Sequence, residues 1–137
     1  MNKILNCLFC DIQTLDMDRI IDENSLVYAV RDGFPVTDGH TLFIPKRHTL
    51  DYFGLADAEV LAINNLLKTH RALLLEKDSS IEGFNIGMNC GEIAGQSIWH
   101  CHVHLIPRRK GDVPFPKGGI RNVIPNKGNY EDLNSID

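Results

Sequence analysis

Three histidines alternate with apolar residues in the segment 98–106, which reads IWHCHVHLI. Side chains two residues apart in a β-strand point to the same face, so His100, His102 and His104 are expected to project together. Neutral imidazoles serve two chemistries near pH 7: they bind zinc, and they act as nucleophiles or acid–base groups. We expect Pro107, which has no N–H for a sheet ladder, to end this strand. The alternative is a row of surface histidines without a function.

A polar loop that contains two glycines, residues 89–97 (NCGEIAGQS), leads into the histidine segment. Glycine lets backbone N–H groups approach an anion closely, and amide and hydroxyl side chains donate to phosphate oxygens. Alone, the loop is a weak signal, but beside a histidine nucleophile it indicates a phosphate-binding site. Its candidate phosphate ligands are Asn89, Gln96 and Ser97.

Two of the four cysteines, Cys7 and Cys10, form a C-x-x-C pair near the start of the chain. The pair has three interpretations: a redox pair without the βαβ context of thioredoxin, two buried thiols that pack as apolar residues, or half of a metal site. A metal would need two more ligands. A disulfide framework does not fit, because a chain of this length builds a real core.

The size and composition indicate one globular domain, since 137 residues with 43% apolar and 23% charged residues match the averages of such domains. We expect a cytoplasmic protein without membrane contact. No apolar run reaches the roughly 18 residues of a membrane-spanning helix, and the start of the chain does not resemble a signal peptide.

The net charge of −4 is unevenly distributed, because residues 108–127 carry six basic side chains against the single acid Asp112. This basic segment is either a solvated loop or a region that attracts an anionic ligand. Nucleic acid binding is not expected, because a single short basic stretch with few aromatic residues lacks the usual footprint.

Hydrophobic patterning predicts five strands and one long helix. The helix spans residues 57–77, where apolar side chains recur every 3.6 residues after Asp57 as its N-cap. The strands are expected at residues 19–22, 25–32, 40–45, 83–89 and 98–106. Strands and helices do not alternate regularly, which favours an α+β fold with a mainly antiparallel sheet. Residues 1–137 form one domain in this interpretation, with residues 108–137 as a basic tail rich in proline and glycine.

The segment GQSIWHCHVHLIPR resembles the signature of the histidine-triad (HIT) family, with Cys101 as the small apolar residue between the first two histidines. The likeness extends from Cys7 to about Pro107. Within it, LVYAVRDGFPVTDGHTLFIPKRH resembles the nucleotide-binding hairpin of that family. The resemblance implies the HIT-like fold, which has a five-stranded sheet and one long helix, and a homodimer, since relatives pair their sheets about a twofold axis.

The resemblance also implies an activity. His102 would attack the α-phosphorus of a nucleotide and form a nucleotidyl-histidine that water later releases, while His104 would donate to phosphate or the leaving group. The implied substrate is a dinucleoside polyphosphate, such as diadenosine tetraphosphate, or a nucleoside phosphoramidate. The alternative is a nucleotide-binding regulatory module with little turnover. The implied binding residues are His40, Asn89, Gln96 and Ser97 for phosphate, Asp32 for ribose, and Val27 and Val30 for the base.

Zinc-bearing members of the bacterial-type branch, and the related galactose-1-phosphate uridylyltransferases, join the C-x-x-C pair to two histidines. The matching positions in this chain are His48, after the third strand, and His100, the first histidine of the triad. The resemblance therefore implies a zinc ion held by Cys7, Cys10, His48 and His100. Such a closed tetrahedral set is structural and leaves no open position for a substrate. Without metal, His100 would orient His102.

Overall fold

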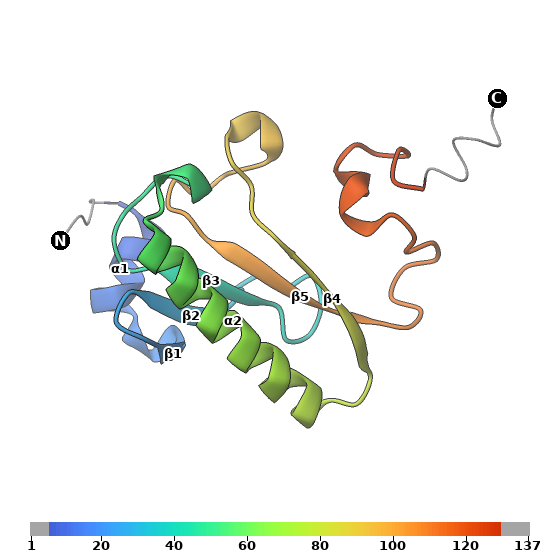
Figure 1. Ribbon diagram of the computed structural model, residues 1–137, viewed down its shortest axis with the longest axis horizontal. Coiled ribbons are helices and arrows are strands. Elements are labelled where there is room, and N and C mark those ends of the chain that lie inside the picture. The colour runs from blue at the N-terminus through green and yellow to red at the C-terminus, as the bar shows by residue number, and fades with distance from the viewer. Residues whose placement is uncertain (1–5, 130–137) are drawn as a thin grey trace.

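The computed structural model describes residues 6–129, and Figure 1 shows the arrangement of their helices and strands. Two α-helices and five strands are joined by loops that contain short 3-10 turns. In chain order the elements are α1 (Leu8–Leu15), β1 (Ile20–Glu23), β2 (Val27–Arg31), β3 (Thr41–Pro45), α2 (Asp57–Lys77), β4 (Ile81–Gly87) and β5 (Val103–Arg109). No helix within residues 6–129 is both long and apolar enough to cross a membrane.

The five strands form one sheet in the order β1-β2-β3-β5-β4, and each pair of neighbours is antiparallel. The predicted α+β fold with an antiparallel sheet and one long helix is therefore confirmed. The short helix α1 is an addition to it. β5 pairs with both β3 and β4, so His104 lies on an interior strand, whereas β4 is an edge of the sheet.

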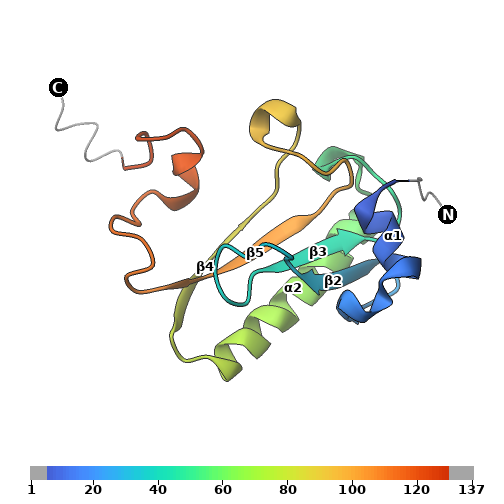
Figure 2. The same ribbon diagram turned by 180° about the vertical axis from the view of Figure 1, so that it is seen from behind.

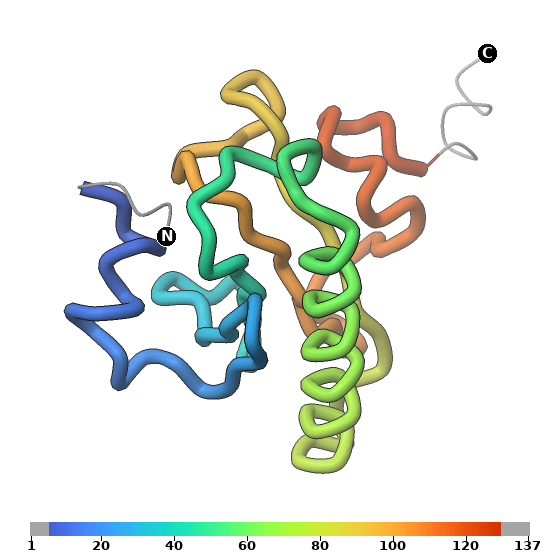
Figure 3. The backbone as a smooth tube through the Cα atoms, turned by 60° about the vertical axis from the view of Figure 1, so that its left-hand side comes forward, coloured from blue at the N-terminus to red at the C-terminus, as the bar shows by residue number. Residues whose placement is uncertain are grey.

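Alternate residues of the strands divide the core into two clusters, one on each face of the sheet. The α2 side holds Val27, Ala29, Phe43 and Leu105 among its buried residues. The α1 side holds Tyr28, Val30, Leu42 and Ile44 with Phe9 and Ile12 of α1. Figures 2 and 3 show the two helices on opposite sides of the sheet. His104 is paired with Leu42, and directly paired residues share a face, so the His104 side chain belongs to the α1 side.

The N-cap of the long helix α2 lies one residue earlier than the predicted cap, Asp57. Ala56 holds the N-cap position and Asp57 is the first helical residue. The carboxylate of Glu59 accepts a hydrogen bond from the Ala56 backbone N–H at 2.8 Å and binds the Arg47 guanidinium at 2.7 Å. This is the half of a capping box that the N3 side chain supplies, and it ties the segment after β3 to the start of the helix.

The histidine strand has different bounds from the predicted ones. β5 begins at Val103 rather than at Ile98, and it continues through Pro107 to Arg109. The backbone N and C=O of a strand residue point to the same side, and the Pro107 carbonyl accepts from the Thr37 hydroxyl at 2.8 Å. On that side the ladder with β3 has already ended at the pair Thr41 and Leu105, so the missing N–H of proline costs no ladder bond.

The basic segment begins inside the sheet, because Arg108 and Arg109 belong to β5. After a turn, the chain returns beside β4 (Figure 1). There the Ile120 side chain lies next to Gly87. Arg108 is paired with Asp112, and Arg109 is paired with Asp78. Two of the six predicted cations are therefore neutralised locally. The predicted tail of residues 108–137 is thus a strand end followed by an irregular segment, and residues 130–137 lie outside the described part.

Candidate functional site

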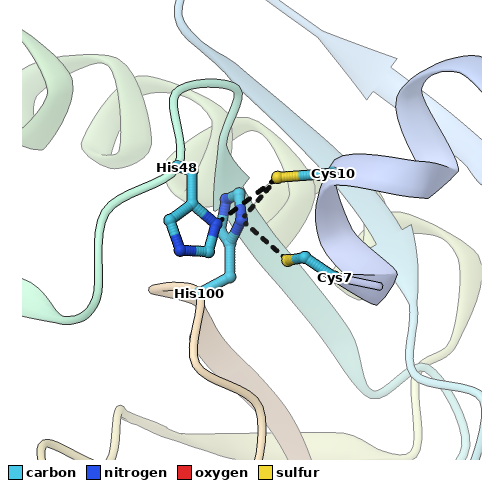
Figure 4. Close-up of side chains that lie close together, drawn as sticks. All are labelled: Cys7, Cys10, His48 and His100. Atoms are coloured by element: carbon cyan, nitrogen blue, oxygen red, sulfur yellow. Dashed lines mark hydrogen bonds between the residues drawn. The ribbon is translucent and has the colours of Figure 1, made fainter. Parts of the chain in front are cut away.

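Two cysteines and two histidines from distant parts of the chain meet at the start of α1 (Figure 4). Cys7 is the N-cap of α1 and Cys10 lies in its first turn, a spacing of three residues that places both thiols on one side. The Cys7 sulfur lies 3.4 Å from His100 Nδ1. The Cys10 sulfur lies 3.4 Å from His48 Nδ1 and 3.6 Å from His100 Nδ1. We call these four residues the thiol cluster.

The geometry of the thiol cluster suits a tetrahedral metal ion. Its four ligand atoms lie within 4.8 Å of one another. In a tetrahedral zinc site, bonds of about 2.3 Å to sulfur and about 2.0 to 2.1 Å to nitrogen place these ligand atoms about 3.5 Å apart, close to the separations found here. The donor set also matches, because two thiolates and two imidazoles are typical ligands of zinc in structural sites.

The ring of His100 is oriented for coordination by its second nitrogen. Its Nε2–H donates to the Pro45 carbonyl at 2.8 Å, which leaves the lone pair on Nδ1 facing the two thiols. The ring is fully buried, and burial lowers the pKa of His100 to about 4, so its neutral form dominates at pH 7. His100 therefore contributes its ring to the thiol cluster, and its backbone carbonyl contacts His102.

His102 lies in the irregular segment before β5, between His100 and the strand. Its Nδ1–H donates to the His100 carbonyl at 2.8 Å, so the lone pair of the neutral ring lies on Nε2. The Phe9 ring packs edge-on against the imidazole, with centroids 4.9 Å apart. Burial lowers the pKa of His102, yet the side chain is partly exposed. His102 thus presents a neutral, unprotonated nitrogen at an accessible position.

A chain of hydrogen bonds sets the protonation of His104. The backbone N–H of Val36 donates to His40 Nδ1 at 3.2 Å, so the neutral His40 ring carries its proton on Nε2. This Nε2 lies 2.9 Å from Nδ1 of His104, which must then accept and carry its own proton on Nε2. Burial lowers the pKa of His40, and burial followed by the charges of His102 and His40 lowers the pKa of His104 to about 4. His104 is therefore a neutral N–H donor at pH 7.

Asp32 completes this second group, which we call the imidazole cluster: Asp32, His40 and His104. One Asp32 carboxylate oxygen lies 3.4 Å from His40 Nε2, and the other accepts from the Phe34 backbone N–H at 2.8 Å. The side chain of Asp32 remains partly exposed, at 17%. It therefore retains capacity for a further donor from outside the protein.

The two valines predicted to line a base pocket lie on opposite faces of the sheet. Val30 packs in the cluster on the α1 side, the side of His104. Val27 packs in the cluster beneath α2 and is fully buried. The structure thus separates Val27 from the imidazole cluster by the thickness of the sheet, and of the two only Val30 lies on the correct side.

The loop of residues 89–97 approaches the site, and its three predicted phosphate ligands differ in availability. Asn89 and Ser97 are exposed. Gln96 is buried: its amide nitrogen donates to the carbonyls of Leu50 and Ile98, and its oxygen accepts from the Gly91 N–H. In this structure Gln96 therefore stabilises the loop, and its contact with phosphate stays a prediction.

Three contributors to the site were missed by the sequence analysis. Phe9 packs against both His100 and His102, and its position inside C-L-F-C is a signal that could have placed it near the pair. The other two are the Pro45 carbonyl and the Val36 N–H, which orient His100 and His40. Every residue except proline has both groups, so no residue type marks them.

Comparison with known proteins supports the family. The HIT domain matches residues 14–111. An uncharacterized HIT-like protein of Mycoplasma genitalium is 41% identical over 108 residues, which cover 78% of this chain and 76% of that protein. A Mycobacterium tuberculosis protein named AP-4-A phosphorylase is 36% identical over 110 residues, which cover 77% of this chain and 55% of that protein.

A solved structure also resembles this chain over nearly its whole length. A zinc-bound histidine triad family protein from Mycobacterium smegmatis matches with a TM-score of 0.69 and 29% sequence identity, covering 96% of this chain and 98% of that one. The matched family covers both the histidine strand and the hairpin that carries Asp32 and His40. The chain therefore belongs to the HIT domain family.

Proposed function

We propose that this protein is a nucleotide hydrolase or transferase that cleaves at the α-phosphate through a covalent intermediate on His102. The observation that carries this proposal is the tautomer of His102. Its Nδ1–H is held by the His100 carbonyl, so Nε2 is free to act as a nucleophile. A neutral nitrogen also avoids the repulsion that an anionic nucleophile meets near a polyphosphate.

The proposed reaction has two steps. In the first, the Nε2 lone pair of His102 forms a bond to the α-phosphorus, and the bond from phosphorus to the leaving group breaks with its electron pair. A polyphosphate leaves as an anion, whereas an amine leaving group takes a proton from solvent water. In the second step, water attacks the phosphorus, the electron pair of the N–P bond returns to Nε2, and the proton of water passes to solvent.

His104 supports this reaction by donating a hydrogen bond. The arrangement that runs from Val36 through His40 leaves its Nε2 protonated and its ring uncharged. Such a donor, directed at a phosphate oxygen, stabilises the charge that develops during transfer. Phosphoryl chemistry depends mainly on positioning and electrostatic stabilisation, so a few fixed donors around one nucleophile are sufficient.

We propose the following roles for the remaining binding residues. The exposed Asn89 and Ser97 contact the phosphates. The resemblance adds Gln96, which would first have to release its loop contacts, and His40, whose ring already bonds to Val36 and His104 and therefore acts on the phosphate through His104. The partly exposed carboxylate of Asp32 accepts from ribose hydroxyls, and Val30 supports the base side of the site from the same face. The substrate is a dinucleoside polyphosphate or a nucleoside phosphoramidate, and the name of the Mycobacterium tuberculosis relative favours the polyphosphate.

The thiol cluster is proposed to hold a structural zinc ion. Cys7, Cys10, His48 and His100 would be its ligands, and the zinc-bound Mycobacterium smegmatis relative supports this choice of metal. When bound, the ion crosslinks the start of α1 to the two segments that carry His48 and His100. Because the His100 carbonyl holds His102, the cluster fixes the position of the nucleophile.

A homodimer formed through the sheet edge is also part of the proposal. β4 is an edge strand, and Ile120 contacts it at Gly87, so a second copy would pair with the part of the edge that the same chain leaves uncovered. Sedimentation analysis at micromolar concentration should give about twice the mass of 15.4 kDa. A mass of one chain would contradict it.

Substitution of His102 tests the nucleophile. His102→Asn is expected to lower turnover of diadenosine tetraphosphate and adenosine 5′-phosphoramidate by at least about 10⁴-fold, a loss typical of a removed nucleophile. Affinity for AMP should change by no more than about tenfold, because the ring acts mainly in the transition state. Product chromatography measures the first quantity and thermal-shift titration the second. Turnover near that of the wild type would refute the assignment.

A mass measurement complements the kinetics. Rapid acid-free quenching of the wild-type protein during turnover should give a fraction of chains heavier by one adenylyl group, and His102→Asn should give none. Absence of the adduct in the wild type, with turnover intact, would favour direct attack by water.

A further inference from the structure

A hollow of about 440 Å³ lies beside the thiol cluster and plays no part in the steps described above. It is lined by Asn6, Cys7, Leu8, His48, Ser97, Ile98 and Trp99. Leu8, Ile98 and Trp99 give the hollow apolar walls, and Ser97 contributes a hydroxyl. The hollow therefore suits a ligand with a flat apolar body and a polar attachment.

Trp99 provides the aromatic surface of the hollow. It is the only tryptophan of the chain, and 46% of its surface is exposed. Its neighbour Ile98, by contrast, packs against the core on the α1 side. A half-exposed indole beside a hollow is a stacking surface for an aromatic ring, and stacking accepts any nucleobase because every base has a π-face.

The position of the hollow relates it to the nucleophile. Trp99 is three residues before His102, so the chain places the two Cα atoms at most about 10 Å apart. Ser97 belongs both to the lining of the hollow and to the predicted phosphate ligands. Asp32 and His40, the proposed contacts of the retained nucleotide, belong to the hairpin formed by β2 and β3 and are absent from this lining. The hollow therefore shares Ser97 with the proposed phosphate contacts and shares neither Asp32 nor His40 with the proposed site of the retained nucleotide.

We infer that this hollow binds the nucleobase of the leaving group, with Trp99 stacked on that base. The inference rests on the proposed function and narrows its substrate class to molecules that carry a nucleoside on both ends, such as a dinucleoside polyphosphate. Ser97 then contacts the phosphate chain between the two nucleosides. A phosphoramidate that releases only ammonia leaves the hollow empty.

Kinetics with two substrates test the inference. Trp99→Leu keeps apolar bulk and removes the aromatic face, while Trp99→Phe retains a smaller one. For diadenosine tetraphosphate, Trp99→Leu should lower kcat/KM by about 5- to 150-fold, the range expected for the loss of one stacked base, and Trp99→Phe should lower it less. For adenosine 5′-phosphoramidate, both variants should stay within about twofold of the wild type, because no base leaves.

Phe115→Leu, an exposed aromatic outside the lining, is the matched control and should change neither rate.

The outcomes separate the two proposals. Equal losses for both substrates, or no loss for either, would overturn the role of Trp99 while the proposed activity stands. A wild-type protein that turns over neither substrate would instead remove the proposed function, and the inference with it. A selective loss for the dinucleotide supports both.

Fluorescence gives an independent reading because Trp99 is the sole indole. His102→Asn holds uncleaved ligand, so its emission can be followed at equilibrium. Diadenosine tetraphosphate should quench the emission strongly, whereas adenosine 5′-tetraphosphate, which has the same phosphate chain without the second base, should have a small effect. Equal quenching by the two ligands, or none by either, would contradict stacking of the second base.

Discussion

The thiol cluster and the imidazole cluster look alike by distance, since each brings its candidate ligand atoms within 4.8 Å of one another. They differ in the backbone group that bonds the second nitrogen of an imidazole ring. In His100 the Nε2–H donates to the Pro45 carbonyl, which leaves an unprotonated Nδ1 facing the thiols. In His40 the Nδ1 accepts from the Val36 N–H, so the ring proton is on Nε2, which faces Asp32 and His104.

This difference assigns opposite roles to two sets of similar residues. A metal ion needs unprotonated nitrogens, so the thiol cluster is prepared to coordinate one. The imidazole cluster already uses the inner nitrogen of His40 as a hydrogen-bond donor, so a metal there would first have to break two hydrogen bonds. Backbone groups that bond the opposite ring nitrogens thus decide which cluster is suited to a metal and which positions a proton.

Removal of one thiol should produce the largest effect. Cys10→Ser is expected to lower bound zinc from about one ion per chain to almost none, since serine is a poor ligand and the remaining three do not close the site. The melting temperature should fall by more than about 10 °C, because a structural metal contributes several kcal/mol of folding free energy. Elemental analysis and calorimetry measure the two quantities.

The matched control for that change is Cys90→Ser, a partly buried cysteine outside both clusters. It should retain zinc and melt within about 2 °C of the wild type, the shift expected for a change of about 0.5 kcal/mol. If Cys10→Ser fails to fold, incubation of the wild-type protein with a strong chelator tests the same point. Unchanged zinc content in Cys10→Ser would show that the thiol cluster is not the metal site.

Substitution of His40 should have an intermediate effect, on activity alone. His40→Leu removes the donor that fixes the His104 tautomer and should lower kcat by about 10- to 100-fold, less than the loss of a direct acid–base group. His40→Gln keeps an N–H donor on its amide and should restore part of that loss. Zinc content should stay the same in both variants. A loss of zinc in His40→Leu would mean that the two clusters are not independent.

The sequence predicted most residues of the two clusters but not the backbone groups that distinguish them. Alternation placed His102 and His104 at the centre of the chemistry, and the C-x-x-C pair with its resemblance to the zinc-bearing relatives selected four residues that do converge. Alternation did not reveal where the strand begins, because an irregular extended segment such as residues 100–102 has the same spacing of side chains. The backbone partners of His40 and His100 have no residue signature at all.

The misplaced valine was avoidable, however. Val27 and Val30 differ by an odd number of positions in one strand, and the alternation that groups the histidines separates these two side chains onto opposite faces. The short helix α1 was harder to foresee. Its eight residues, LFCDIQTL, are too few to display a clear helical period, and its stability comes from packing, including the hydrogen bond of the Tyr28 hydroxyl to the Phe9 carbonyl.

The smallest expected effect is on the pH dependence of the melting temperature, which should distinguish the two clusters. In the unfolded chain His104 titrates near pH 6.5, whereas burial and the neighbouring rings lower its pKa to about 4 in the folded protein. Between these values the unfolded chain binds more protons, so the free energy of unfolding falls as the pH falls. His104→Asn removes this contribution and should make the decline of melting temperature between pH 7 and pH 4 shallower.

The thiol cluster responds to the same acid by a separate route, because protonation of its thiolates releases the metal. A zinc-sensitive dye can follow that release in the same pH series. In His104→Asn the release curve should match that of the wild type even though the melting curve is shallower, since the His104 ring belongs to the other cluster. An unchanged melting slope would contradict the low pKa of His104. A shifted release curve would show that protonation of the imidazole cluster is transmitted to the metal site, through the segment in which the His100 carbonyl holds His102.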